Sequence, residues 1–242
     1  MPLLNFRDVA STAGPGLRPG VLLRSAQPDS PTPDDAALLT GLRLIVDLRG
    51  AGEFTDGDRP VRAAPDARVI HRPLPGTTAD LLALAATRDP GAGAGTSTGT
   101  GLGAYYVRVL DQHADWLAEV IAEIADRLPA LVHCAAGKDR TGLVVALVLD
   151  LVGVDHDAIV RDYTATADHL PQIIDMLARR APSAEAEERV RAAADAGLLD
   201  APEGAIRTAL EALAARGGSE QLLAPHGLSA AHIQRLRAAL TG

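Results

Sequence analysis

The segment Ala130–Leu151 has the sequence ALVHCAAGKDRTGLVVALVLDL, and it decides the fold. It opens with a short apolar run that follows Pro129, which predicts a buried strand. It closes with residues 141–151, which are apolar on every side and predict a helix buried in the middle of the domain. The loop Cys134–Arg140 connects the two, so this segment predicts a strand, a tight loop and a buried helix in immediate succession.

Further strands and helices alternate on both sides of this segment. That pattern predicts an α/β fold: a central, mostly parallel sheet flanked by helices, with a helix-rich C-terminal third. The expected strands are Val21–Leu23, Leu42–Leu48, Val69–Leu74 and Ala130–Cys134. The expected helices are Pro33–Leu39, one long stripe Val107–Leu128, and then Thr141–Leu151, Asp157–Tyr163, Pro171–Arg180, Ala184–Ala196, Glu203–Arg216 and Ser229–Leu240.

No composition change divides the chain, so residues 1–242 are expected to form a single domain. The stretch Asp89–Gly103 consists almost entirely of Gly, Ala, Ser and Thr. Such a segment buries too little apolar surface to offset the entropy of ordering it. We therefore expect a flexible or lid-like insertion around residues 78–103.

Composition excludes several classes of protein. Aromatic residues make up only 2% of the chain and the net charge is −8, which disfavours nucleic acids and anionic membranes as partners. Cys134 is the only cysteine, so no intrachain disulfide or thiolate zinc site is expected, and no histidine spacing indicates another metal. The longest apolar run, Leu143–Leu149, is too short to span a bilayer. With no export signal visible, we expect a cytoplasmic protein, and export without a signal stays open.

The loop Cys134–Arg140 carries the chemistry. A cysteine between a strand end and a helix N-terminus faces free backbone N–H groups and the positive end of the helix dipole. It is therefore expected to be a thiolate nucleophile, with a tetrahedral anion cradled by the backbone of Ala135, Ala136, Gly137, Lys138 and Asp139. Arg140 can hold two phosphate oxygens in a bidentate fork. We expect Thr141 to donate its hydroxyl to the sulfur.

The pattern HC-x5-RTG over His133–Gly142 resembles the signature of cysteine-dependent phosphatases. In the form HCxxGKDRTG it is similar to the atypical bacterial and fungal tyrosine phosphatases related to the secreted mycobacterial enzyme. Three further blocks resemble that family: Asn5-Phe6-Arg7-Asp8, Arg24-Ser25, and Asp47-Leu48-Arg49 with Glu53. The resemblance implies a cysteine-phosphatase fold, attack by Cys134 on phosphotyrosine proteins, a phosphocysteine intermediate, inorganic phosphate as product and no cofactor.

The sequence identifies the general acid less directly than the nucleophile. Many cysteine phosphatases carry an aspartate about thirty residues upstream of the cysteine, but here residues 101–104 contain no carboxylate. The resembled family places this role inside the cradle, which implies Asp139. Asp80 and Asp111 are weaker candidates, and Asp139 could instead act only on the helix dipole.

Four residues, His133, Thr141, Asp47 and Arg49, are expected to support the site, and Lys138 is expected to add positive charge at its rim. Lys138 is the only lysine of the chain, and a lysine in the cradle resembles that of lipid phosphatases, so we also expect activity on phosphoinositides. Asp47 and Arg49 are interpreted as an ion pair bracing the loop, with substrate contact as the alternative.

Other functions fit the same loop. The main interpretation includes phosphoserine and phosphothreonine as further substrates beside phosphotyrosine. As alternatives, the protein could be a phosphate-recognition module without activity, an enzyme acting primarily on phosphoinositides, or a sulfur-transfer enzyme. The intact Cys134, Asp139 and Arg140 argue against the first, and the continuation Thr141-Gly142 argues against the last.

Overall fold

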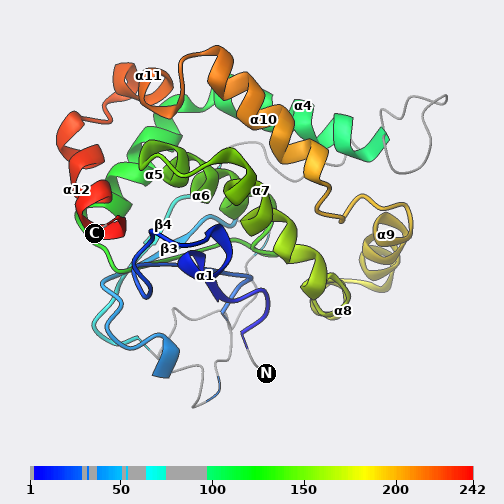
Figure 1. Cartoon of the computed structure of the whole chain (residues 1–242). Helices are drawn as coiled ribbons and strands as arrows, with labels where there is room; N and C mark the ends of the chain where they lie inside the picture. Colours follow the sequence, from blue (N-terminus) through cyan, green and yellow to red (C-terminus); the bar gives the residue numbers. More distant parts are fainter. Residues whose placement is uncertain are drawn as a thin grey trace.

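The computed structural model describes residues 3–28, 32, 37–50, 53, 64–74 and 97–241. In these parts of the chain five strands form one sheet in the order β1-β2-β5-β3-β4 (Figure 1). β1 pairs antiparallel with β2, and the other pairs are parallel, as the alternating pattern predicted. The strands are β1 Arg7–Asp8, β2 Leu22–Ser25, β3 Leu44–Asp47, β4 Arg68–His71 and β5 Ala130–His133. The sequence did not indicate β1, which is only two residues long.

Side chains of the central strands point alternately to the two faces of the sheet, and both sets are buried. Leu44 and Val46 of β3 face the larger core, together with Val132 of β5. Ile45 and Leu131 point to the opposite face and pack in a smaller cluster with residues of the N-terminal segment.

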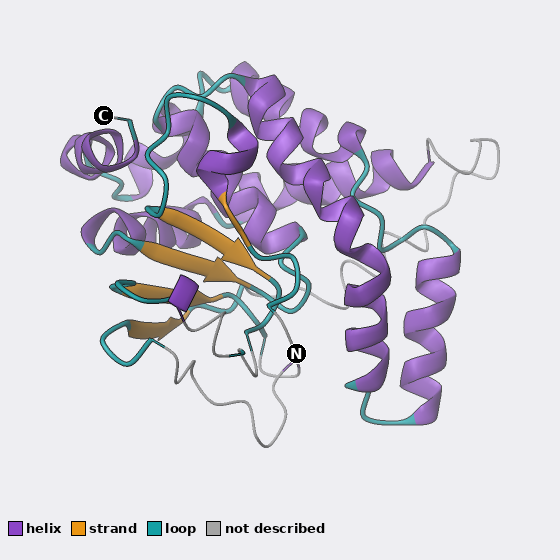
Figure 2. Ribbon diagram, turned by 60° about the horizontal axis from the view of Figure 1, so that its bottom comes forward, coloured by secondary structure: helices purple, strands orange, loops and turns teal. Residues whose placement is uncertain are grey.

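Most of the helices lie over the face with the larger core, whereas the opposite face has little helical cover (Figure 2). The short α1 spans Val9–Ala13. The helices of the described ranges also include α4 Ser97–Gln112, α5 Ala114–Asp126, α6 Asp139–Leu151, α7 His156–Thr164, α8 Leu170–Arg179, α9 Ala184–Asp195, α10 Glu203–Ala215, α11 Ser219–Leu223 and α12 Ala230–Leu240, with 3-10 turns at Ala165–His169 and Ala224–His226.

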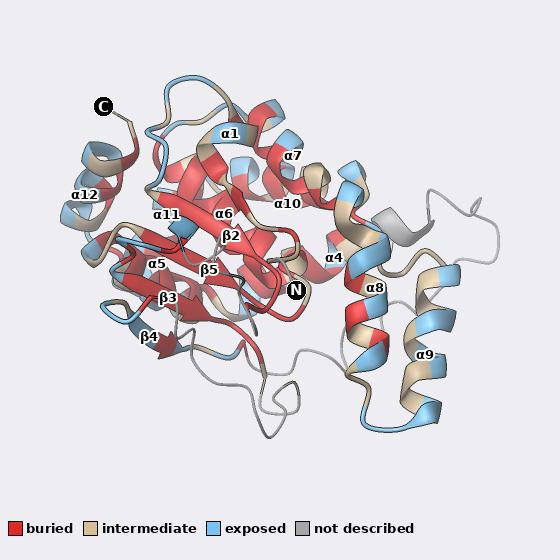
Figure 3. Cartoon of the chain, turned by 90° about the horizontal axis from the view of Figure 1, so that it is seen from below, coloured by how far each residue is buried: buried red, intermediate tan, exposed pale blue. Residues whose placement is uncertain are grey.

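Burial follows the expected pattern most closely in α6. Eleven of its residues are buried, and Figure 3 shows this helix in the interior of the molecule. In contrast, α9 has no buried residue, and it stands beside α8 as a hairpin at one side of the molecule (Figure 3). None of the described helices is both long and apolar enough to cross a membrane.

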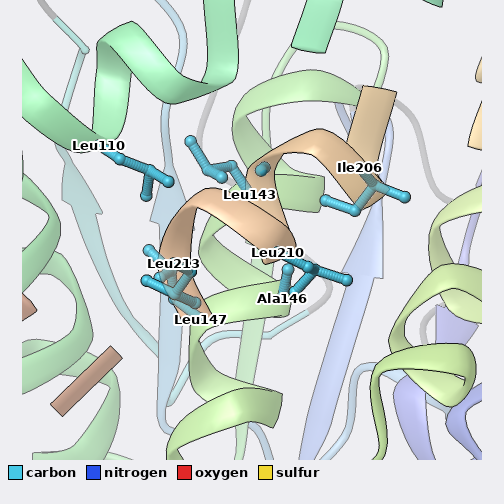
Figure 4. Close-up of a pocket in the computed structure, with 8 residues that line it drawn as sticks. Leu110, Leu143, Ala146, Leu147, Ile206, Leu210 and Leu213 are labelled. Carbon is cyan, nitrogen blue, oxygen red and sulfur yellow. The ribbon is translucent and has the colours of Figure 1, made fainter. Parts of the chain in front are cut away.

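A small cavity lies where α4, α6 and α10 meet. Its walls are aliphatic throughout, formed by side chains such as Leu110, Leu143 and Ile206 (Figure 4). Because no polar group lines it, this cavity is a packing gap of the core rather than a binding site for a charged ligand.

Two expectations about the region before β5 need correction. The single helix over Val107–Leu128 is in fact two helices, α4 and α5, separated at His113, whose φ of −132° lies outside the helical range. A break of one residue leaves the spacing of 3 and 4 almost intact, so the apolar stripe continues across it.

The C-terminal end of the expected insertion is helical, because residues 97–103 form the first turns of α4. Gly103 packs closely on α10: a Cβ at this position would lie 2.8 Å from Cβ of Thr208. Tertiary packing thus overrides the weak helix propensity of the glycine-rich stretch. Residues 78–96 of the expected insertion lie outside the described residues, as do residues 33–36 of the helix expected over Pro33–Leu39.

Candidate active site

The loop that follows β5 lies at the carboxyl edge of the sheet. The register pairs His133 with Ser25 of β2 on one side and with Asp47 of β3 on the other. The segments that continue from these three strands therefore meet at one place. In an open parallel sheet, ligands bind in such a crevice beyond the strand ends.

Cys134 is 1% exposed, and its loop leads directly into α6, which begins at Asp139. Gly137 has a φ of +66°, and a Cβ there would lie 2.2 Å from the carbonyl oxygen of Ser25. Only glycine fits both this conformation and this close approach. The loop is thus pressed against the end of β2 while the N-terminus of α6 faces the cysteine, an arrangement suited to an anion.

Arg140 is held in place by Glu53. The Nη1 and Nη2 groups of Arg140 donate to the two carboxylate oxygens of Glu53, and Nη1 also donates to the carbonyl of Leu48 at 3.1 Å. Burial alone would lower the pKa of Arg140, but the charges of Cys134 and Glu53 outweigh it and raise the pKa. The guanidinium is therefore always charged.

Glu53 binds the edge of the guanidinium formed by Nη1 and Nη2, so the edge that includes Nε stays available to a ligand. Nε of Arg140 is buried and has no hydrogen-bond partner among the described residues. The edge formed by Nε and Nη2 can therefore receive two oxygens of a phosphoryl group while Glu53 keeps the other edge. Glu53 belongs to one of the family blocks, but nothing in the sequence indicated its role beside Arg140.

The carboxylate of Asp139 is tied to two buried tyrosines. The Tyr106 hydroxyl donates to Oδ1 of Asp139 at 2.7 Å, and the hydroxyls of Tyr106 and Tyr163 are 2.8 Å apart. Burial and the charge of Asp139 raise the pKa of Tyr106 well above its ordinary value, so the hydroxyl keeps its proton. Nothing in the sequence indicated these tyrosines as neighbours of the loop.

Lys138 lies in a different place from the one its expected role requires. Its Nζ donates to the backbone carbonyls of Leu199 (2.8 Å) and Asp200 (2.7 Å), before α10, and the residue is 3% exposed. Nζ is also 3.5 Å from Oδ1 of Asp139. In this structure the ammonium group connects the loop to the helical half of the chain instead of standing free at a rim.

The supporting residues lie close to the cysteine. Burial lowers the pKa of His133 to about 4, against the opposing charge of Asp47, so its imidazole is neutral at pH 7. Thr141 is fully buried, but its hydroxyl has no hydrogen-bond partner in the described part of the chain. The expected hydrogen bond from Thr141 to the sulfur is therefore not made in this structure.

Asp47 and Arg49 form a buried ion pair. Nη2 of Arg49 donates to Oδ2 of Asp47 at 2.8 Å, and Nη1 donates to Oε1 of Gln27 at 3.1 Å. Burial would raise the pKa of Asp47, but the hydrogen bond from Arg49 outweighs it and the pKa is lowered. The pair thus links the segments that follow β3 and β2 beside the loop.

On its buried side the loop contacts a network that the sequence analysis missed. We call Asn5, Arg7, Arg24 and Asp162 the buried brace. Asp162 of α7 pairs with Arg24, and with Arg7 at 3.0 Å. The only signal for this network was that Asn5, Arg7 and Arg24 belong to the family blocks. Nothing in the sequence indicated that Asp162 belongs to this network.

Of the other acid candidates, Asp111 pairs with a residue outside the loop. Asp111 lies near the end of α4, and its carboxylate pairs with Arg216, which follows α10, at 2.6 Å. Asp80 lies outside the described residues. Among the described residues no group of three His, Cys, Asp or Glu side chains is arranged to bind a metal ion.

Comparison with known proteins agrees with this geometry. A family model described as the tyrosine phosphatase family matches residues 2–242. The triple specificity protein phosphatase PtpB of Mycobacterium tuberculosis is 33% identical, over 98% of this chain and 96% of that protein. A tyrosine-protein phosphatase of Nostoc commune is 32% identical, over 85% of this chain and 68% of that protein.

Proposed function

The chain belongs to the tyrosine phosphatase family, and from this premise we propose that it hydrolyses phosphotyrosine through a phosphocysteine intermediate on Cys134. The observation that carries the proposal is the loop at the carboxyl end of β5. It combines a buried cysteine, a helix N-terminus and an arginine whose Nε has no hydrogen-bond partner among the residues that the structure describes.

The reaction proceeds in two displacements. The Cys134 thiolate attacks phosphorus, the bond between phosphorus and the ester oxygen breaks, and the leaving oxygen takes a proton from Asp139. Water then attacks the phosphocysteine, Asp139 takes back a proton, and inorganic phosphate and the thiolate are released. In both steps Arg140 and the loop N–H groups bind the equatorial oxygens, where the charge of the transition state lies.

The surroundings of Asp139 support its role as the acid. Both polar contacts described for this carboxylate, from Tyr106 and Lys138, fall on Oδ1. A carboxylic acid whose Oδ1 accepts these contacts carries its proton on Oδ2. Oδ2 is therefore the oxygen that would donate to the leaving group.

The proposed substrate range is wider than phosphotyrosine. A relative that aligns along nearly the whole chain is called a triple specificity phosphatase, and we extend this range to phosphoserine, phosphothreonine and phosphoinositides. Lys138 supports the phosphoinositide part only if its side chain leaves the carbonyls of Leu199 and Asp200. Equal rates of Lys138→Ala and wild type on every phosphoinositide would remove the role of Lys138. The single cysteine also supports a reducing, cytoplasmic setting.

The test is phosphate release from p-nitrophenyl phosphate, a phosphotyrosine peptide, a phosphoserine peptide and a phosphoinositide panel. Cys134→Ser is expected to abolish turnover. Asp139→Asn is expected to lose most activity on esters with poor leaving groups, whereas Asp111→Asn serves as the matched control and keeps it.

Three outcomes would contradict parts of the proposal. Full activity of Asp139→Asn on poor leaving groups would remove the acid role. Phosphate binding without turnover in the reduced wild type would instead favour the recognition module. A ranking with phosphoinositides far above the peptides would favour an enzyme that acts mainly on lipids.

A further inference from the structure

The buried brace is centred on a carboxylate in the interior of the protein. Asp162 is 1% exposed and Arg24 is fully buried. Burial would raise the pKa of Asp162, but the charges of Arg24 and Arg7 outweigh it and lower the pKa. Burial and the charge of Arg24 lower the pKa of Arg7 to about 10, so Arg7 is still protonated at pH 7. Two cations thus face one carboxylate, which leaves net positive charge behind the loop.

This brace contacts the loop through backbone carbonyls. Nη2 of Arg24 donates to the carbonyl of Gly137 at 2.8 Å. Nδ2 of Asn5 donates to the carbonyls of Ala136 and Gly137 at 3.0 and 3.1 Å. Three hydrogen bonds therefore hold two consecutive peptide groups from the buried side.

Holding these carbonyls also orients the amides. In a trans peptide the C=O and the following N–H point in opposite directions. Carbonyls of residues 136 and 137 that point to the brace therefore turn the N–H groups of residues 137 and 138 away from it. In the described residues, neither of these N–H groups donates to a backbone carbonyl, so both remain available to an anion.

We propose that Asn5, Arg24 and Asp162 are positioning residues of the phosphate cradle. Asn5 and Arg24 hold the loop carbonyls so that the N–H groups of Gly137 and Lys138 face the phosphoryl oxygens, and Asp162 holds Arg24 in that position. The inference rests on the proposed function, because it assumes that the loop binds the phosphoryl group.

The test removes the Asn5 side chain without straining the backbone. Asn5 has a φ of +51°, in the left-handed region that glycine adopts freely, so Asn5→Gly removes the donor with little backbone cost. Inorganic vanadate serves as the probe of the cradle, and kcat and KM are measured with p-nitrophenyl phosphate. Vanadate is expected to bind about tenfold more weakly, and kcat/KM is expected to fall by a similar factor, since hydrogen bonds that keep the loop N–H groups oriented contribute on this scale.

Thr12→Val is the matched control. The Thr12 hydroxyl donates to Oδ1 of the same Asp162 at 2.6 Å, and no contact of Thr12 with the loop is described. This variant is expected to lower the melting temperature while vanadate affinity and kcat/KM stay as in the wild type. A merely structural brace would instead make the two variants alike, with stability lowered and vanadate affinity unchanged.

If Asn5→Gly does not fold, Asn5→Asp replaces it. An aspartate keeps the size of the side chain and an acceptor for Arg7, but it has no donor for the loop carbonyls, so the same loss of vanadate affinity is expected. A folded Asn5 variant that binds vanadate as the wild type does would overturn the positioning proposal. A reduced wild type that neither binds vanadate nor turns over would overturn the proposed function instead, so the two failures are distinguishable.

Discussion

Two arginine–carboxylate pairs flank the loop, one on each side. On the buried side, the side chains of Arg24 and Asp162 are 0% and 2% exposed. On the open side, those of Arg140 and Glu53 are 7% and 19% exposed. Arg24 also donates from Nη2 to a loop carbonyl, whereas Arg140 donates to the carbonyl of Leu48, and Nε of both arginines has no hydrogen-bond partner in the described residues.

The two pairs consist of the same chemical groups but do different work. Removing one partner of a fully buried pair leaves an uncompensated charge, at a cost of about 3–5 kcal/mol. The partly open pair is better hydrated, so its loss costs less stability. It affects Arg140, the residue proposed to bind the phosphoryl group. Changes on the buried side should therefore reduce stability and activity together, and changes on the open side should reduce activity alone.

The largest effect is expected for Gly137→Ala, on the buried side. The added Cβ would lie 2.2 Å from the carbonyl oxygen of Ser25 at a φ of +66°, so the loop must move or the fold must loosen. We expect urea unfolding to show a loss of about 3 kcal/mol or more, together with loss of turnover.

The control for this change is Gly153→Ala. Gly153 also has a positive φ, +84°, but nothing lies within 4 Å of the added Cβ. It should lose only about 1 kcal/mol, the backbone cost alone. Equal losses in the two variants would show that the contact between the loop and β2 contributes nothing.

The next effect concerns pH and His133. The unfolded chain protonates this histidine below about pH 6.5, whereas the buried imidazole, with a pKa lowered to about 4, stays neutral. Because the unfolded state binds more protons across this window, the free energy of unfolding falls as the pH drops from 6.5 toward 4.

Urea unfolding at pH 7 and pH 5 tests this. The wild type should lose about 2 kcal/mol more than His133→Gln, which lacks the titrating group. Protonation of carboxylates such as Asp47 and Asp162 also destabilises the folded protein in acid, but this effect is present in both proteins. The same pH dependence in both would mean that His133 is not buried in neutral form.

A smaller effect is expected for Glu53→Gln, on the open side. The amide keeps the size of the carboxylate but removes the charge that orients Arg140. We expect kcat/KM to fall about tenfold while the free energy of unfolding changes by less than about 1 kcal/mol. Glu187→Gln, in an exposed pair with Arg191 on α9, is the control and should change neither. A large loss of stability in Glu53→Gln would remove the distinction between the two pairs.

The smallest effect is expected for Tyr106→Phe. This change removes the hydroxyl that donates to Oδ1 of Asp139 and leaves the buried ring. We expect kcat to fall about threefold for esters with poor leaving groups and less for p-nitrophenyl phosphate. Tyr163→Phe, one hydrogen bond further from Asp139, should have a weaker effect. An equal decrease for all leaving groups would mean that Tyr106 does not act through the acid.

Much of the fold follows from local pattern. The strand, loop and helix around Cys134 were predicted at nearly their observed bounds, because apolar run length and helix periodicity are properties of neighbouring residues. Where a distant contact decides, the prediction was wrong. Residues 97–103 looked like a loop because their glycines are weak helix formers, but Gly103 is needed there for the close packing of α4 against α10.

The α/β alternation, the loop that begins at Cys134 and the pair Asp47 and Arg49 can be predicted from the sequence, since each is encoded in a short run of residues. What surrounds the loop depends on tertiary packing. Asn5 lies 131 residues from the carbonyl it binds, and Asp162 lies 138 residues from Arg24. Likewise, Glu53 and Tyr106 reach Arg140 and Asp139 through folding alone. Sequence patterns record spacing along the chain, whereas hydrogen bonds and charges act across space, so these partners become visible only once the strands and helices have packed.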